Sequence, residues 1–419
     1  MKSVESQKEF SQRWIVLLAL LTALGPLSID MYLPALPQMA DDFGVTTQQV
    51  ANSLPAYFLG LAIGQLIYGP VSDRIGRKTP LYFGLVLYIC ASFLCVFAKS
   101  EWSLIAARVL QALGGCVGVV IARAAIRDRL SMQASAQAFA SMMIVTTIAP
   151  IIAPTLGAWV LQVFEWQYIF AVLVLVGIFC LFCVHFFFQE TLPVERRLKL
   201  SLKQVLGLYG AILQDETFRK PMLTGCFSGA ILQDETFRKP MLTGCFSGAI
   251  LFCYISGSSA ILMDGYGLSQ QQFAYVFGAN ALGIMVFSTL NKKLANRLDV
   301  RHRLQLGNAL QLCGVLILLA AGLYNLSSII VVMFGMFLCV ASIGFTGPNA
   351  MALAMSEQGS RAGTASAIMG SMQFACGLLA GVFLNFLVWS ALINMALIML
   401  LFVVVAMFNM RSLKASAMG

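Results

Sequence analysis

The sequence predicts an all-α integral membrane protein with twelve transmembrane helices in two six-helix halves. Hydrophobic residues make up 59% of the 419 residues, charged residues make up only 11%, and the mean hydropathy is +0.84. A soluble domain carries roughly 25% charged residues, so much of this apolar surface must face lipid. The apolar residues form runs close to the ~20 residues that a helix needs to cross a bilayer. The charges lie in the short gaps between these runs.

Six apolar runs precede a polar stretch and six follow it. The predicted spans of the first half are 14–37, 50–72, 80–98, 103–125, 136–163 and 167–188. Those of the second half are 241–263, 270–290, 304–323, 328–350, 362–386 and 388–409. We therefore divide the chain into an N-terminal half (1–188), a cytoplasmic linker (189–240) and a C-terminal half (241–419). Transporters with two such halves bind substrate between them, near the middle of the membrane.

The basic residues predict the orientation of the spans. With the N-terminus inside, 25 of the 27 Lys and Arg fall in inner segments, Lys99 lies outside and Arg108 lies within a span. The positive-inside rule then places both termini in the cytoplasm, as expected for a bacterial-type inner membrane. The first apolar stretch is too long for the apolar region of a signal peptide and carries Asp30, so it is predicted to be a span. The net charge of +9 follows from this bias, which indicates a lipid bilayer rather than nucleic acid as partner.

The predicted linker contains a perfect repeat. Residues 211–229 recur unchanged as 230–248, which indicates a recent in-frame tandem duplication or an error of sequence assembly. The first copy offers only about twelve apolar residues before the charged segment 233–239. Asp, Arg and Lys each cost ~2.5–3.5 kcal/mol at the centre of a membrane helix. We therefore expect the seventh span to use the second copy, and the first copy to lie in the linker or at the inner interface.

Three polar residues inside the spans are the first functional candidates. Asp30 is the acidic residue deep within a predicted span, where a carboxylate is costly and by default indicates a functional site. Arg108 in the fourth span lies at a similar depth, so an ion pair is expected if the two helices are neighbours. Gln111 lies one helical turn from Arg108 on the same face. A protonatable acid beside a fixed cation suits the coupling of proton and substrate movements.

The loop after the second span is the next candidate. Gly69, Asp73, Arg74, Gly76, Arg77 and Lys78 form the pattern G-x-x-x-D-R-x-G-R-K. The glycines permit tight turns, and Asp73 can accept charge-assisted hydrogen bonds at a helix end or from arginine. We interpret this segment as a charged conformational latch between helix ends, although an ordinary basic inner loop has a similar composition.

Four motifs give a specific resemblance. The loop at 69–78 is similar to the signature loop of the major facilitator superfamily, and Arg108 with the following residues resembles the fourth-span motif of that family. The segment 149–158 is similar to the fifth-span motif of its proton antiporters. Together with 28–37, these motifs resemble the bicyclomycin/chloramphenicol-resistance subgroup of drug:proton antiporters, over nearly the whole chain outside the extra 19 residues.

The resemblance assigns roles to individual residues. It implies that Asp73 and Arg77 latch the two conformations and that Asp30 and Arg108 take part in proton or substrate coupling. It also implies that Pro150, Pro154 and Gly157 shape a fifth helix that favours exchange. The chain departs from the family at Ala153 and Ala158, where the motif usually has glycine. The corresponding loop of the second half, 291–297, lacks Asp and Gly, which predicts a weak or lost latch there.

The predicted function is export of small amphipathic, drug-like compounds in exchange for protons. Polar or aromatic residues inside spans are candidates for lining an apolar substrate cavity, namely Tyr32, Tyr57, Tyr254, Asn280, Asn349 and Gln373. The proton gradient is the expected energy source, because no phosphate-binding loop for ATP occurs. No cofactor, metal or enzymatic activity is expected, and the chain is expected to be a monomer. The alternatives are a proton-coupled transporter of a metabolite, such as an amino acid or a sugar, and a non-transporting membrane receptor or enzyme.

Overall fold

The computed structural model describes residues 12–130, 132–197, 235–324, 328–356, 362–384 and 386–411. Every regular element in these ranges is helical. Within them, ten helices are long and apolar enough to cross a membrane, and α8 and α18 contain the shorter apolar segments Ile148–Val160 and Ile368–Phe383. Together these helices correspond to the twelve predicted spans and confirm the predicted all-α membrane fold.

The chain forms two compact units. The first unit comprises the described residues of Met1–Ala35 and Leu59–Val205, and the second comprises those of Leu36–Phe58 and Leu206–Gly419. This division differs from the predicted halves at 36–58, a segment that packs with the second unit through α3, α4 and the start of α5.

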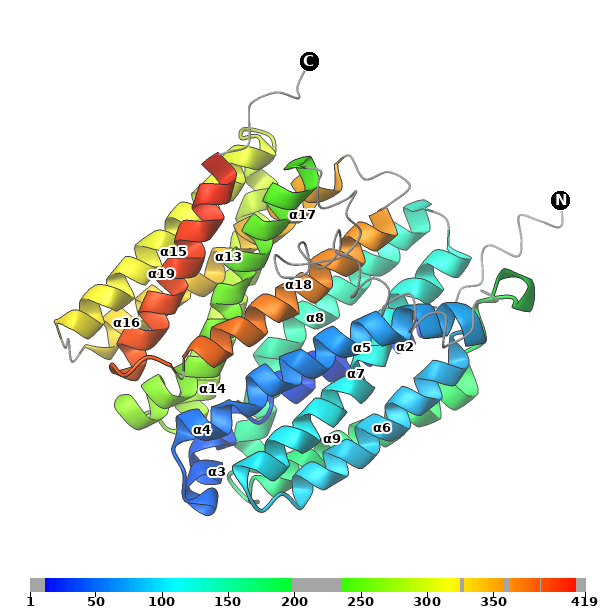
Figure 1. The fold of residues 1–419 in the computed structure, drawn as a ribbon, viewed down its shortest axis with the longest axis horizontal. Helices are drawn as coiled ribbons and strands as arrows, with labels where there is room; N and C mark the ends of the chain where they lie inside the picture. Colours follow the sequence, from blue (N-terminus) through cyan, green and yellow to red (C-terminus); the bar gives the residue numbers. More distant parts are fainter. Residues whose placement is uncertain are drawn as a thin grey trace, which may run out of the picture. The chain divides into compact units, whose positions relative to one another are not determined.

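In the first unit, α2, α6, α7, α8 and α9 pack side by side, and α5 approaches α7 closely at Gly60 (Figure 1). Helix α6 contacts both α7 and α9, and α2 contacts α7, α8 and α9. The elements are α2 (Gln12–Asp30), η1 (Leu33–Ala35), α5 (Ser53–Ile75), α6 (Lys78–Val96), α7 (Glu101–Arg129), α8 (Met132–Val160), α9 (Gln167–Phe187) and η2 (Val194–Arg196).

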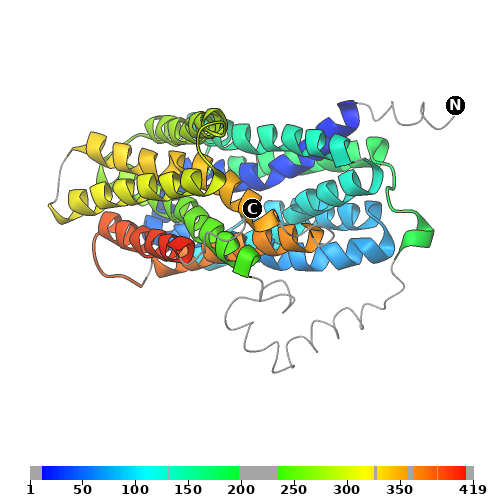
Figure 2. The same cartoon turned by 90° about the horizontal axis from the view of Figure 1, so that it is seen from above.

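In the second unit, α13 is the central helix and contacts α17, α18 and α19. Helix α15 lies beside α16 and α19 (Figure 1, Figure 2). The elements are α3 (Leu36–Phe43), α4 (Thr47–Ala51), α13 (Glu235–Ser259), η3 (Ala260–Gly265), α14 (Gln270–Leu294), α15 (Val300–Leu323), α16 (Ile329–Ala341), α17 (Ile343–Met355), α18 (Ala362–Phe383) and α19 (Ala391–Arg411).

The seventh span uses the second copy of the repeat, as predicted. Helix α13 begins at Glu235, earlier than the predicted start at 241, and continues into the membrane-length segment Glu235–Gly265. Glu235 pairs with Lys239 across one helical turn at 2.5 Å, so the charged residues before Pro240 form the first turn of the helix. The first copy, 211–229, lies outside the described residues.

Four predicted spans are interrupted, and the second span along the chain is broken at Asn52, between α4 and α5. The first is broken after Asp30, because Pro34 has no N–H to donate to the Asp30 carbonyl and restricts Leu33. The seventh ends in the π-helical turn η3, a form that occurs frequently at functional sites. The tenth is divided into α16 and α17 at Ser342, whose hydroxyl donates to the Cys339 carbonyl at 2.9 Å.

Candidate functional site

The first part of the site surrounds Asp30 at the broken end of α2. Its side chain is 3% exposed, and within the described residues its Oδ1 has no hydrogen-bond partner. An ionised carboxylate is costly in such surroundings unless it gains a cation or a proton. The predicted fifth-span motif approaches this break through Gly157 of α8, where an added Cβ would lie 1.8 Å from the Met31 carbonyl oxygen. The glycine therefore allows the backbone of α8 to touch the backbone beside Asp30.

The rest of the fifth-span motif lies on the same helix. Pro150 and Pro154 are both inside α8, and Pro154 is buried. Ala153 and Ala158, which replace the usual glycines, are 0% and 1% exposed, so α8 accommodates their methyl groups within its packed face.

Arg108 is fully buried on α7, which packs against α2. Its Nη1 donates to the Gln111 side-chain oxygen at 2.5 Å, which confirms the predicted shared face. The guanidinium carbon lies 4.4 Å from the centre of the Tyr32 ring. The ion pairs of the described residues do not include Asp30 with Arg108. In this conformation the cation is stabilised by an aromatic face and an amide instead.

A chain of hydrogen bonds leads from Arg108 back toward α2. The Gln111 side-chain nitrogen donates to the Ser92 hydroxyl at 2.8 Å, and Ser92 donates to the Tyr88 carbonyl at 2.7 Å. The Tyr88 hydroxyl lies 2.7 Å from the Ser28 hydroxyl on α2. Ser28 is two residues from Asp30, so α2, α6 and α7 are joined by buried polar side chains near the carboxyl.

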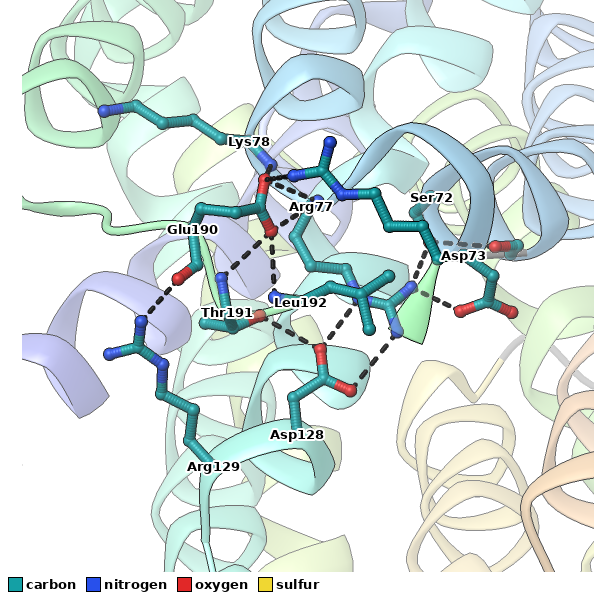
Figure 3. Close-up of polar contacts among 11 residues, drawn as sticks. Ser72, Asp73, Arg77, Lys78, Asp128, Arg129, Glu190, Thr191 and Leu192 are labelled. Atoms are coloured by element: carbon teal, nitrogen blue, oxygen red, sulfur yellow. Dashed lines mark hydrogen bonds and ion pairs between the residues drawn. The ribbon is translucent and has the colours of Figure 1, made fainter. Parts of the chain in front are cut away.

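The second part of the site is the Arg77 cluster, which comprises Ser72, Asp73, Arg77, Asp128 and Glu190 (Figure 3). The Arg77 Nη1 lies 2.6 Å from Asp73 Oδ1 and donates to the Ser72 hydroxyl at 2.6 Å. Its Nε donates to Asp128 Oδ2 at 2.8 Å. The Arg77 side chain is 5% exposed, so one buried cation joins the ends of α5 and α7.

Glu190, which follows α9, caps the start of α6. Its carboxylate accepts the backbone N–H groups of Arg77 at 2.8 Å, Lys78 at 3.1 Å and Leu192 at 3.0 Å. Gly76 makes this approach possible, because its φ is +95° and an added Cβ would lie 2.5 Å from Glu190 Oε2. Gly76 thus forms a tight turn that admits the Glu190 carboxylate from the segment after α9.

The electrostatics of the Arg77 cluster favour its charged form. Burial alone would lower the pKa of Arg77, but its hydrogen bonds to Asp128 and Asp73 outweigh burial and raise that pKa. Burial alone would raise the pKa of Glu190, but the backbone donors of Arg77, Leu192, Lys78 and Thr191 outweigh it and lower that pKa. Both groups are therefore ionised at neutral pH.

Sequence reasoning found only part of this cluster. Asp73, Gly76, Arg77 and Lys78 were predicted, and Gly69 takes part through its carbonyl, which accepts the Ser72 hydroxyl at 2.8 Å. Arg74 lies in the last turn of α5. Asp128 and Glu190 were missed, as were Thr191, whose hydroxyl donates to Asp128 Oδ2 at 3.0 Å, and Arg129, whose guanidinium donates to the Glu190 carbonyl. The signal for the two acids was a carboxylate at the end of a predicted span in otherwise basic surroundings, namely Asp128 between two arginines and Glu190 after the sixth apolar run.

The second unit holds a counterpart whose acceptors are neutral, the Arg303 cluster, which comprises Asn291, Arg303 and Asn349. The Arg303 Nη1 donates to the Asn291 side-chain oxygen at 3.0 Å and to its carbonyl at 3.3 Å. Asn349 donates to the same side-chain oxygen at 2.9 Å. The predicted loop 291–297 contributes Asn291, whereas the arginine comes from α15, and its acceptors are an amide and backbone carbonyls instead of carboxylates.

The six residues predicted to line a cavity have different surroundings. Tyr32 packs under Arg108, Asn349 belongs to the Arg303 cluster, and Asn280 donates to the Tyr254 hydroxyl at 2.8 Å. These residues and Tyr57 are at most 3% exposed. Gln373 has an exposed side chain next to Gly248.

Known proteins resemble this chain over most of its length. A profile of the Major Facilitator Superfamily matches residues 18–381. The uncharacterized MFS-type transporter YdgK of Bacillus subtilis is 32% identical over 363 residues, 86% of this chain and 85% of that protein. The bicyclomycin resistance protein homolog of Haemophilus influenzae is 28% identical over 382 residues, 90% of this chain and 89% of that protein.

Other comparisons agree. The multidrug resistance protein MdtL of Escherichia coli is 34% identical over 183 residues, 44% of this chain and 47% of that protein. The solved structure of a peptide transporter, POT, has a TM-score of 0.73 at 12% identity and covers 97% of this chain and 95% of its own. A D-xylose-proton symporter has a TM-score of 0.70 at 14% identity, with 95% and 96% covered. At these identities, the two structures show a shared fold.

Proposed function

This chain belongs to the Major Facilitator Superfamily, and on that basis we propose that it exports small, drug-like compounds in exchange for protons. As a member it is a multi-pass membrane transporter of small molecules and not an enzyme. The similarity to a bicyclomycin resistance protein homolog and to the multidrug resistance protein MdtL supports drugs as the substrate class.

The buried carboxyl of Asp30 is the observation that carries the proposal. It lies where α2 breaks, beside the backbone contact between Met31 and Gly157. The buried hydrogen bonds that begin at Ser28 connect this region to Arg108. A proton that enters from outside binds Asp30 and removes its charge, and loss of that proton to the inside restores it. Substrate and proton compete for the Asp30 region in this proposal, so each cycle exchanges one for the other.

The Arg77 cluster serves in this proposal as the latch of one conformation. It ties the ends of α5 and α7 to the segment after α9 through one buried cation. Opening it separates ion pairs that are partly buried, which sets a barrier between the two conformations that substrate or proton binding offsets.

The proposed setting is the inner membrane of a bacterium, with both termini in the cytoplasm and the chain working as a monomer. The proton gradient is the energy source, and no bound cofactor is needed. The distribution of basic residues supports this orientation, because the ends near Arg77 and Arg303 carry most of the cations. Labelling of single cysteines from either side of intact cells tests it, and labelling from outside at the Arg77 end would reverse it.

Proton movement in inverted membrane vesicles tests the function. Vesicles energised to an acidic interior are challenged with chloramphenicol and with bicyclomycin, and the interior pH is followed with a quenched dye. We expect at least one compound to release protons from the wild-type vesicles. Asp30→Asn should abolish that release, because an amide cannot exchange a proton.

Asp41→Asn is the matched control, since Asp41 is an exposed carboxylate at the end of α3 in the same span. It should retain proton release at the wild-type level. Coupled export by Asp30→Asn that equals the wild type would remove Asp30 from the mechanism. If no drug releases protons, although blotting confirms that the protein is inserted in the membrane, the substrate would instead be a metabolite.

A further inference from the structure

Lys78, Tyr82 and His185 meet where the start of α6 lies beside the end of α9. The Tyr82 hydroxyl is 3.0 Å from His185 Nδ1, and the Lys78 ammonium donates to the His185 carbonyl at 3.4 Å. The same ammonium lies 5.9 Å from the centre of the Tyr82 ring. The His185 side chain is exposed, and its hydrogen bond engages Nδ1, so Nε2 is the nitrogen available to a ligand.

The positive charge of Lys78 is directed away from the carboxylates of the Arg77 cluster. Its side chain extends away from Asp73 and Asp128 (Figure 3). The Glu190 carboxylate accepts the backbone N–H of Lys78, and Glu190 Oε2 forms an ion pair with Arg197 Nη2 at 3.8 Å. In the ion pairs of the described residues, no carboxylate is assigned to the Lys78 ammonium, whose acceptor is a backbone carbonyl. This group can therefore receive an anion.

An apolar, aromatic face continues from this group along both helices. On α6, Phe83 and Val86 are 67% and 48% exposed. On α9, Phe182 and Phe186 are 54% and 62% exposed, and their rings contact each other at 4.5 Å between centres. In a membrane protein such a face contacts acyl chains, and aromatic rings near its end lie at the level of the head groups.

We propose that this place is a binding site for an anionic phospholipid. The lipid phosphate contacts the Lys78 ammonium and the His185 ring, and the acyl chains lie on Phe83, Phe182 and Phe186. An anionic head group complements this site, because the Lys78 ammonium, the His185 ring and the Tyr82 hydroxyl converge at one end of an apolar face. The inference is independent of substrate and of transport direction, so it stands or falls apart from the proposed function.

The site has a direct connection to the Arg77 cluster. The Lys78 side chain binds the lipid, while the Lys78 backbone N–H donates to the Glu190 carboxylate. The preceding residue is Arg77, whose backbone N–H donates to the same carboxylate. An anionic lipid at Lys78 therefore holds the start of α6 in the position that the Glu190 carboxylate requires.

Native mass spectrometry of the full chain in detergent tests the site, with dioleoyl-phosphatidylglycerol and dioleoyl-phosphatidylcholine as probes. We expect preferential binding of phosphatidylglycerol to the wild type. Lys78→Gln and His185→Gln should each weaken it, by roughly fivefold for the lost cation in Lys78→Gln. Lys78→Arg, which keeps the charge, should retain it and shows that the position tolerates substitution.

Lys293→Gln is the matched control, because Lys293 is an exposed lysine in the last turn of α14. It should bind phosphatidylglycerol like the wild type. Equal binding by the wild type, Lys78→Gln and His185→Gln would overturn the site, as would equal affinity for phosphatidylcholine. Displacement of the lipid by millimolar inorganic phosphate would show a site for a soluble anion and would also overturn the proposal.

Discussion

The Arg77 and Arg303 clusters perform the same structural task with different chemistry. Each buries one arginine between helix ends, at 4% and 9% residue exposure. Arg77 meets the carboxylates of Asp73 and Asp128, whereas Arg303 meets the amide of Asn291 and backbone carbonyls. Both arginines make charge-assisted hydrogen bonds, but of the two only Arg77 has ion pairs among the described residues. The first unit thus contains an ion-paired latch, and the second contains an arginine held by neutral acceptors.

This asymmetry indicates where the conformational barrier lies. A hydrogen bond from a charged donor to a neutral acceptor contributes about 1.5–3 kcal/mol, and water can replace the acceptor without leaving a desolvated anion. Separating a partly buried ion pair leaves desolvated charges on both sides and costs more, about 3–5 kcal/mol. We infer that the Arg77 cluster sets the energy needed to leave this conformation and that the Arg303 cluster rearranges at a lower cost.

Removal of each arginine gives the largest expected difference. Arg77→Met should lower the free energy of unfolding by about 3 kcal/mol, the low end for a broken buried pair, because Asp73 is 47% exposed. Arg303→Met should cost less, about 1–2 kcal/mol, since it leaves only neutral acceptors. Thermal melting of the purified variants in one detergent measures both. Equal losses would show that the carboxylates add nothing, and the comparison would fail.

The fold was predictable because hydropathy sums over about twenty residues and tolerates local exceptions. The four breaks were not, since each depends on a few residues. Pro34 was visible, but the loss of its bond to the Asp30 carbonyl required knowledge of where α2 ends. The second copy of the repeat was assigned correctly because a run of charges is costly in lipid at any tertiary packing.

The site was predictable only where its members are close in sequence. Asp73 and Arg77 are one helical turn apart, and Arg108 and Gln111 likewise share a face. Asp128 and Glu190 reach the same arginine from other helices, and pairing over such separations depends on packing. The depth argument placed Asp30 and Arg108 at a similar level of the membrane, and the structure shows that their helices α2 and α7 are neighbours. It could not show that Tyr32 would take the face of the guanidinium.

Addition of a carboxylate to the Arg303 cluster should change the free energy of unfolding by less than the removal of Arg77, and in the opposite direction. Asn291→Asp places a carboxylate 3.0 Å from the Arg303 guanidinium, where Asn349 can still donate to it. Stability should rise by about 1 kcal/mol, because the arginine is already buried and the added charge neutralises it. Transport should slow, since a second ion pair must now open in each cycle.

Melting and transport rates of this variant are compared with those of Asn409→Asp. Asn409 is an asparagine near the end of α19 whose side chain donates to the Val405 carbonyl, so the control adds the same charge away from Arg303. It should not be stabilised. A fall in stability of Asn291→Asp to the level of this control would mean that desolvation of the new carboxylate outweighs its pairing, and that the amide is the better partner for Arg303.

The pH dependence of Glu190 separates the two clusters with the smallest effect. The pKa of Glu190 is lowered in the folded protein, so its contribution is complete above its ordinary value of 4.5 and is lost as the pH falls through the lowered value. The difference in melting temperature between the wild type and Glu190→Gln should therefore be constant from roughly pH 6 to 9 and shrink in acid. The Arg303 cluster has no carboxylate among its three members, so Asn349→Ala should show a difference that does not change over the same acid range.

A Glu190→Gln difference that instead grows in acid would mean that the carboxyl is protonated in the folded state, and the charged latch would have to be abandoned.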